Sequence, residues 1–118
     1  MPLNETKPRY SKEDLEEFKK NIVEKLKKSN ENISFLAKLL ANSERKGNES
    51  EKAALNQLID RQNKLIDKLE SALEKVKNGN YGICLATGKL INKDRLRLIP
   101  YVNEAVHEQK NKNLDFSL

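Results

Sequence analysis

The most constraining feature of this sequence is a pair of long apolar patterns with helical spacing. The first places leucine, isoleucine and phenylalanine at intervals of three, four or seven residues between Leu15 and Leu40. The second is a heptad pattern in which only Gln62 is polar. Its members are Leu55, Leu58, Gln62, Leu65, Leu69, Ala72 and Val76. Such spacing gathers side chains on one helix face. Because neither helix can bury its stripe alone, the two helices are predicted to pack together.

Local signals predict where these helices begin and end. Ser11, with Asp14 three residues later, predicts the start of the first helix. Residues 42–48 are rich in Asn, Ser and Gly and predict a turn of about seven residues. Asn78 and Gly79 predict the end of the second helix. Since helices joined by a short turn lie antiparallel, we predict a mainly α fold built on a long antiparallel two-helix hairpin, a coiled coil.

The remaining segments are short and differ in character. Residues 80–91 predict two short extended pieces, Asn92 can cap a short turn, and a last helix is expected from about Tyr101 to Lys110. The predicted organisation is a flexible N-terminal arm at 1–9, a helical hairpin at 10–78 with its tip near 42–49, a C-terminal module at 79–110 and a frayed tail at 111–118.

Composition excludes several classes of protein. A chain of 118 residues allows one domain, and 35% of it is charged, with 23 Lys and Arg against 18 Asp and Glu. It has no apolar run of about 20 residues, which predicts no membrane span. One Cys, one His and the lack of a Gly-rich phosphate loop argue against an enzyme. With no secretory signal, we expect a cytoplasmic protein.

The segment after the second helix resembles a known family. Tyr81-Gly82-Ile83-Cys84-Leu85-Ala86-Thr87-Gly88-Lys89-Leu90-Ile91, followed by Arg95-Leu96 and Ile99-Pro100, is similar to the C-terminal part of the DksA/TraR family. Those are bacterial transcription factors that bind RNA polymerase, in which a helical hairpin precedes a four-cysteine zinc finger. The resemblance implies a small zinc-finger-like α+β module after the hairpin.

The zinc-ligand positions of that family are degenerate in this chain. They fall on Cys84, Thr87, Ala105 and Glu108, so three of four cysteines are lost. Structural zinc needs four donors, and even with His107 added the set would form an open, weak site. We therefore expect a module without zinc or another cofactor, held by apolar contacts in which Cys84 is a core residue. The expected contacts involve Ile83, Leu85, Leu90, Ile91, Leu96, Leu98, Ile99, Val102, Ala105 and Val106.

The hairpin tip also departs from the family. The family tip carries an acidic Asp-x-x-Asp-x-Ala motif, whereas here Lys52 occupies the middle acidic position between Glu49 and Ala54. The regulatory activity of the tip is therefore not carried over, but the hairpin keeps a length suited to a deep channel.

The resemblance implies a non-enzymatic transcription regulator that binds RNA polymerase through its secondary channel. The candidate partner-binding residues are Glu44, Arg45, Lys46, Glu49 and Glu51 at the tip and Lys89, Lys93, Arg95 and Arg97 in the module. Two other interpretations stay open. A second apolar stripe of Ile59, Ile66 and Leu73 could mediate self-association into a homo-oligomer. The basic module could contact nucleic acid, although only Tyr81 and Tyr101 offer stacking rings.

Overall fold

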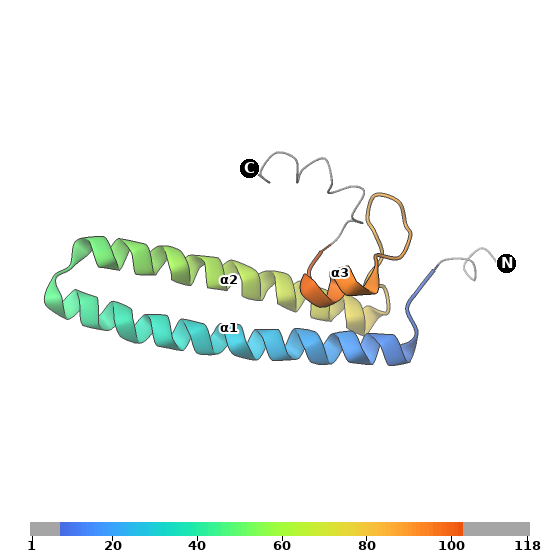
Figure 1. Ribbon diagram of the computed structural model, residues 1–118, viewed down its shortest axis with the longest axis horizontal. Helices are drawn as coiled ribbons and strands as arrows, with labels where there is room; N and C mark the ends of the chain where they lie inside the picture. Colours follow the sequence, from blue (N-terminus) through green and yellow to red (C-terminus); the bar gives the residue numbers. More distant parts are fainter. Residues whose placement is uncertain (1–7, 103–118) are drawn as a thin grey trace.

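The protein is a long helical hairpin with a small module folded back on its open end (Figure 1). The computed structural model describes residues 8–102. Helix α1 spans Lys12–Lys46, α2 spans Glu49–Asn78 and the short α3 spans Lys93–Leu98. The molecule measures 66 × 32 × 21 Å along its principal axes. The predicted antiparallel hairpin of two long helices is confirmed. No helix in the described part of the chain has the apolar length that a membrane crossing requires.

The hairpin turn is much shorter than the predicted seven residues. Helix α1 continues to Lys46, and only Gly47 and Asn48 separate it from α2. Gly47 adopts a left-handed conformation with φ of 70°, and the Asn48 side chain accepts a hydrogen bond from the Glu51 amide at 3.1 Å. These two residues end one helix and start the next by themselves. The helix-forming residues before Gly47 therefore have no reason to unwind.

The packing seam of α2 is rotated from the predicted one. Leu55, Leu69 and Ala72 are buried as expected, but Leu58 keeps 42% of its surface exposed. Ile59 and Ile66, from the neighbouring stripe, are half-buried. Both stripes of α2 therefore share the contact with α1. The prediction that Leu58 belongs to the buried seam is wrong, because a wide apolar face leaves the rotation of a helix undetermined.

The main core lies at the open end of the hairpin, where the module packs. It joins both helices to the module through Phe18, Ile22, Leu69, Ala72, Tyr81, Cys84, Ile91, Leu96 and Val102. Away from this end, the hairpin is a single layer of two helices (Figure 1), and most of its side chains there are exposed. The molecule is therefore a compact base with a long, thin projection.

The module is held by local backbone bonds and a minimal β contact. The two predicted extended pieces meet in a single antiparallel bridge between Ile83 and Leu90, and the described residues form no longer strand. The Cys84 amide donates to the Lys89 carbonyl at 2.7 Å, closing the loop between them. Asn92 caps α3, as predicted, through a hydrogen bond to the Asp94 amide at 2.7 Å. The helix expected at 101–110 and the tail at 111–118 lie outside the described residues.

Candidate functional site

The tip of the hairpin carries an exposed group of mixed charges. Glu44, Arg45, Lys46 and Glu49 lie around the two-residue turn, and each is exposed. The structure thus brings together the tip residues that the sequence singled out. Glu51 belongs to the same group, and its carboxylate accepts a hydrogen bond from the buried Ser43 hydroxyl across the turn.

The tip differs chemically from a cluster of free carboxylates. The Lys52 ammonium lies 3.5 Å from the Glu49 carboxylate, one helical turn away. The Glu51 carboxylate is already engaged with Ser43. Of the three tip acids, Glu44 therefore has the carboxylate least engaged by a described contact. A tip of this kind presents both signs of charge to a partner.

The predicted basic patch of the module is partly used to hold the module on α1. Lys93 lies 3.1 Å from the Asp14 carboxylate. Arg97 lies 3.1 Å from Glu17, and also pairs with Asp94 of its own helix at 2.9 Å. These contacts connect the acidic first turns of α1 with α3. Lys93 and Arg97 therefore fix the orientation of the module.

These ion pairs shift the pKa values of Asp14 and Arg97. The hydrogen bond from Lys93 is the main reason that the pKa of Asp14 lies below its ordinary value. The hydrogen bond to Glu17 is the main reason that the pKa of Arg97 is raised. Arg97 is exposed and Asp14 is half-buried at the surface, so water screens the pairs and each contributes little to stability. They act as orienting contacts more than as a source of folding energy.

The other two basic residues of the predicted patch have different environments. Lys89 is exposed in the loop that follows Thr87. Arg95 is half-buried, and its Nε atom is buried without a hydrogen-bond partner among the described residues. Lys89 is thus the basic residue of the module most open to a partner.

The described residues at the family's zinc positions do not fit a zinc ion. Cys84 is 1% exposed within the apolar core, whereas Thr87 is on the surface and accepts a hydrogen bond from the Lys89 amide at 3.2 Å. A threonine hydroxyl is not one of the donors that structural zinc uses. No group of three His, Cys, Asp or Glu side chains within residues 8–102 is arranged to hold a metal. Ala105 and Glu108 lie outside the described residues.

Aromatic rings occupy the junction between hairpin and module. The Phe18 ring contacts Tyr10 edge-on and Tyr81 at a tilt, with both centroid distances at 5.2 Å. The Tyr10 hydroxyl donates to the Ile91 carbonyl, and the buried Tyr81 hydroxyl donates to the Pro100 carbonyl at 2.8 Å. Sequence reasoning missed this cluster, although two tyrosines flanking the hairpin in a chain with 5% aromatic residues were a usable signal.

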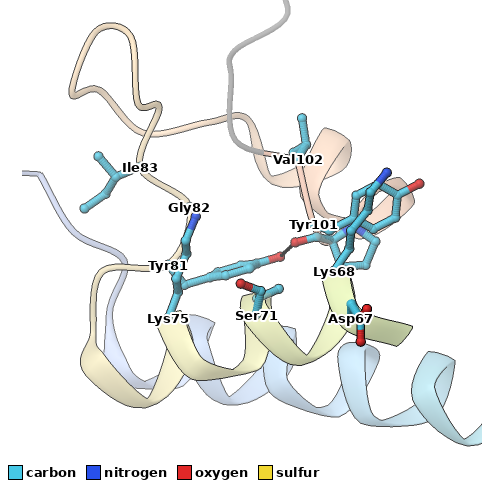
Figure 2. Close-up of a pocket in the computed structure, with 11 residues that line it drawn as sticks. Asp67, Lys68, Ser71, Lys75, Tyr81, Gly82, Ile83, Tyr101 and Val102 are labelled. Carbon is cyan, nitrogen blue, oxygen red and sulfur yellow. Dashed lines mark hydrogen bonds between the residues drawn. The ribbon is translucent and has the colours of Figure 1, made fainter. Parts of the chain in front are cut away.

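A cavity of about 220 Å³ lies between α2 and the module (Figure 2). Tyr81 crosses its floor toward the Pro100 carbonyl, and the Lys68 ammonium lies 5.2 Å from the centre of the Tyr101 ring. Asp67, Ser71 and Lys75 complete the α2 wall. No local sequence signal marks Lys68, because its partner ring is 33 residues away.

The comparisons with known proteins agree with this architecture. No family model matches the chain. Over 112 residues the chain is 34% identical to the RNA polymerase-binding transcription factor DksA of Caulobacter vibrioides, covering 92% of this chain and 77% of the relative. The chain belongs to the DksA/TraR family. The resemblance found in the sequence is thereby confirmed.

Two further proteins are similar to this DksA/TraR chain. General stress protein 16O of Bacillus subtilis is 41% identical over 51 residues, which are 43% of this chain and 30% of that protein. The structure of the transcription factor DksA2 from Pseudomonas aeruginosa matches with a TM-score of 0.79 at 23% identity, covering 89% of this chain and 87% of that one. That structural match shows a shared fold.

Proposed function

We propose that this chain is a non-enzymatic transcription regulator that binds RNA polymerase by inserting its hairpin into the secondary channel. The observation that carries the proposal is 34% identity to an RNA polymerase-binding transcription factor over 92% of the chain. The shape supports it, because α1 with 35 residues forms a rod of about 50 Å whose tip carries only small turn residues and charges. We also propose that the protein acts in the cytoplasm, since its partner would be RNA polymerase.

Within this proposal, the tip and the module have separate roles. The tip, with Glu44, Arg45, Lys46 and Glu49, reaches furthest into the channel. It lacks the acidic motif of the family, so we propose that the tip binds without reproducing that motif's regulatory effect. The module, with the exposed Lys89, contacts the outer surface of the polymerase. Basic groups there would speed the encounter with an acidic surface more than they raise affinity.

We further propose that the module keeps its zinc-finger-like form without a metal. Cys84 is buried with Tyr81, Ile91 and Leu96, so apolar packing occupies the place where a metal would otherwise organise the loops. The aromatic contacts of Phe18 tie this packing to the hairpin. In this proposal the hydrophobic core supplies the folding free energy that zinc supplies in a four-cysteine finger.

The decisive experiment is binding to purified core RNA polymerase. We expect the chain to be retained by immobilised polymerase at low salt and to be displaced by a factor that is known to occupy the secondary channel. Retention without displacement would place the chain elsewhere on the polymerase. Absence of retention at low salt would reject the proposal.

Self-association remains a less favoured alternative. Its proposed interface of Ile59, Ile66 and Leu73 is half-buried within the single chain, and Leu73 packs against the main core. Little of that stripe is left for a second copy. Sedimentation over a range of micromolar concentrations separates the two cases, because a self-associating chain would grow heavier with concentration.

A further inference from the structure

One face of the hairpin carries a continuous stripe of side chains that runs from the base toward the tip. On α1 it runs at steps of three and four residues: Asp14, Glu17, Asn21, Lys25, Lys28, Asn32, Phe35 and Leu39. Its first three residues hold the module, because Asp14 and Glu17 pair with α3 and the Asn21 amide donates to the Arg97 carbonyl at 3.2 Å. The module therefore covers the base of this face and leaves its distal part open.

Helix α2 contributes a matching stripe to the same face. A shallow groove is lined together by Lys25, Lys28 and Asn32 of α1 and by Leu65 of α2, next to Leu98 and Tyr101 of the module. Leu58 and Arg61 precede Leu65 by seven and four residues, so they lie on the same side of α2 as Leu65. This shared groove fixes which sides of the two helices form one surface.

The distal end of this face is an exposed apolar patch. Phe35 is 61% exposed, Leu39 is 38% exposed and Leu58 is 42% exposed. Phe35 and Leu39 lie 12 and 8 residues before Gly47, and Leu58 lies 10 residues after Asn48, so all three stand at similar heights along the antiparallel rod. We name these three residues the distal apolar patch. The largest exposed apolar patch on a protein is often a functional surface.

The size of the patch argues against a second copy of the chain as its occupant. Three side chains exposed to these degrees offer on the order of 300 Å² of apolar area. A stable protein dimer buries about 800 Å² on each partner. The patch alone is too small for that, but it is the right size for the apolar centre of a larger interface that also includes the tip and the module.

The charges beside the patch indicate the chemistry of the partner. Between the module and the patch, the charged residues of the two stripes are Lys25, Lys28 and Arg61, all basic. Glu24 and Glu31 lie beside Lys25 and Lys28 on α1, outside the stripe. A complementary surface would carry an apolar pocket bordered by carboxylates.

We propose that the distal apolar patch is an anchor that docks into an apolar pocket, bordered by acidic residues, on the wall of the RNA polymerase channel. This inference rests on the proposed function, because that function encloses this part of the rod in a protein cavity. Phe35 supplies the largest side chain, and large aromatic side chains in interface centres dominate binding energy. The anchor lies between the tip and the module and sets how deeply the rod enters.

The test compares variants on opposite faces of the same hairpin. The double variant Phe35→Gln with Leu58→Gln replaces the most exposed patch residue on each helix and keeps good helix-forming residues. The matched control is Val23→Gln, because Val23 is 46% exposed and lies among Glu16, Lys19, Lys20 and Lys27 on another side of α1. We expect the double variant to bind core polymerase at least tenfold more weakly, while the control stays within twofold. Circular dichroism and the melting temperature should match wild type in both.

The remaining outcomes separate this inference from the function on which it rests. If wild type binds polymerase and the double variant binds equally well, the anchor is wrong and the proposed function stands. If wild type does not bind, both are wrong. If wild type sediments as a dimer and the double variant as a monomer, a second copy covers the patch and the anchor is again wrong.

If the patch variant unfolds, a charge variant provides a second test of the proposed anchor. Lys28→Glu with Arg61→Glu should slow association with polymerase at least threefold at low salt. Lys27→Glu, on a different side of α1, should have a smaller effect. Equal association rates for the two charge variants would overturn the proposed acidic border.

Discussion

Three aromatic residues connect the module to the hairpin at the level of single side chains. Phe18 lies between Tyr10 and Tyr81, and each tyrosine hydroxyl donates to a backbone carbonyl of the module. The rings supply apolar contact, and the hydroxyls select one orientation, because a buried carbonyl without a partner is costly. This combination of apolar and polar contacts fixes how the module sits on the hairpin.

The buried tyrosines predict a loss of stability at alkaline pH. Burial raises the pKa of Tyr81 above its ordinary value of 10.0, with a smaller effect from Tyr10, and burial also raises the pKa of Tyr10. The folded state therefore holds protons that the unfolded state releases. This contribution is complete below pH 10 and is lost as the pH rises above it. Denaturant melts between pH 8 and 11 should show the free energy of unfolding falling above pH 10.

The variant Tyr81→Phe identifies the source of that loss. It should unfold more easily at pH 7 by about 1–3 kcal/mol, since the Pro100 carbonyl loses its donor. Its stability should then fall less steeply above pH 10 than that of wild type. An unchanged slope would mean that Tyr81 is not the source of the alkaline loss.

Gly82 should tolerate a side chain less well than Gly88. Both have positive φ, at 84° and 77°, so alanine costs about 1–2 kcal/mol of backbone strain at either position. A Cβ on Gly82 would also come within 2.7 Å of the Tyr10 ring, whereas a Cβ on Gly88 would meet open space. We expect Gly82→Ala to lower the melting temperature clearly more than Gly88→Ala. Equal shifts in thermal melts would show that Tyr10 moves aside freely.

At the scale of elements, the sequence predicted the helix starts, ends and caps that depend on neighbouring residues. The helix start at Ser11, the helix end at Gly79 and the cap at Asn92 all follow from local hydrogen bonding, and all are confirmed. The length of the turn does not follow in the same way. Asn42 and Ser43 read as turn residues, but α1 continues through them until Gly47 ends it, and the Ser43 hydroxyl donates a hydrogen bond across the turn to Glu51.

The candidate site was less predictable than the helices, because it depends on contacts between distant segments. The acidic first turns of α1 and the basic residues of α3 were each visible in the sequence. Only the return of the module to the base of the hairpin places Lys93 beside Asp14, 79 positions earlier. Leu58 was misplaced for a related reason, since the rotation of α2 is set by its packing on both α1 and the module.

The cap at Asn48 should be the main local stabiliser of the hairpin turn. Asn48→Ala removes the acceptor of the Glu51 amide and should cost about 1 kcal/mol, or a melting temperature lower by about 5 °C. Ser50→Ala, two residues later on the exposed first turn of α2, is the matched control and should change stability by less than half as much. Equal melting temperatures for the two variants would show that the turn is held by Gly47 and the Ser43–Glu51 bond instead.

At the scale of the whole molecule, the apolar core and the exposed apolar patch lie toward opposite ends of the hairpin. The apolar core gathers at the base, where both helices and the module meet, while the distal half exposes charges at the tip and an apolar patch beside it. Because the base carries most of the core, changes in the distal half should alter binding without unfolding the chain. Binding and folding can therefore be measured separately in variants of the distal half.

The apolar core at the base also predicts how the molecule responds to removal of metal ions. If the core around Cys84 replaces a zinc site, a chelator should leave the melting curve unchanged, and purified protein should contain far less than one zinc per chain. Cys84→Ala should lower stability by about 1 kcal/mol through lost packing, by the same amount with and without chelator. A stoichiometric zinc content, or a Cys84→Ala effect that disappears when chelator is present, would show instead that Cys84 binds a metal and that the metal, not the apolar core, holds the module.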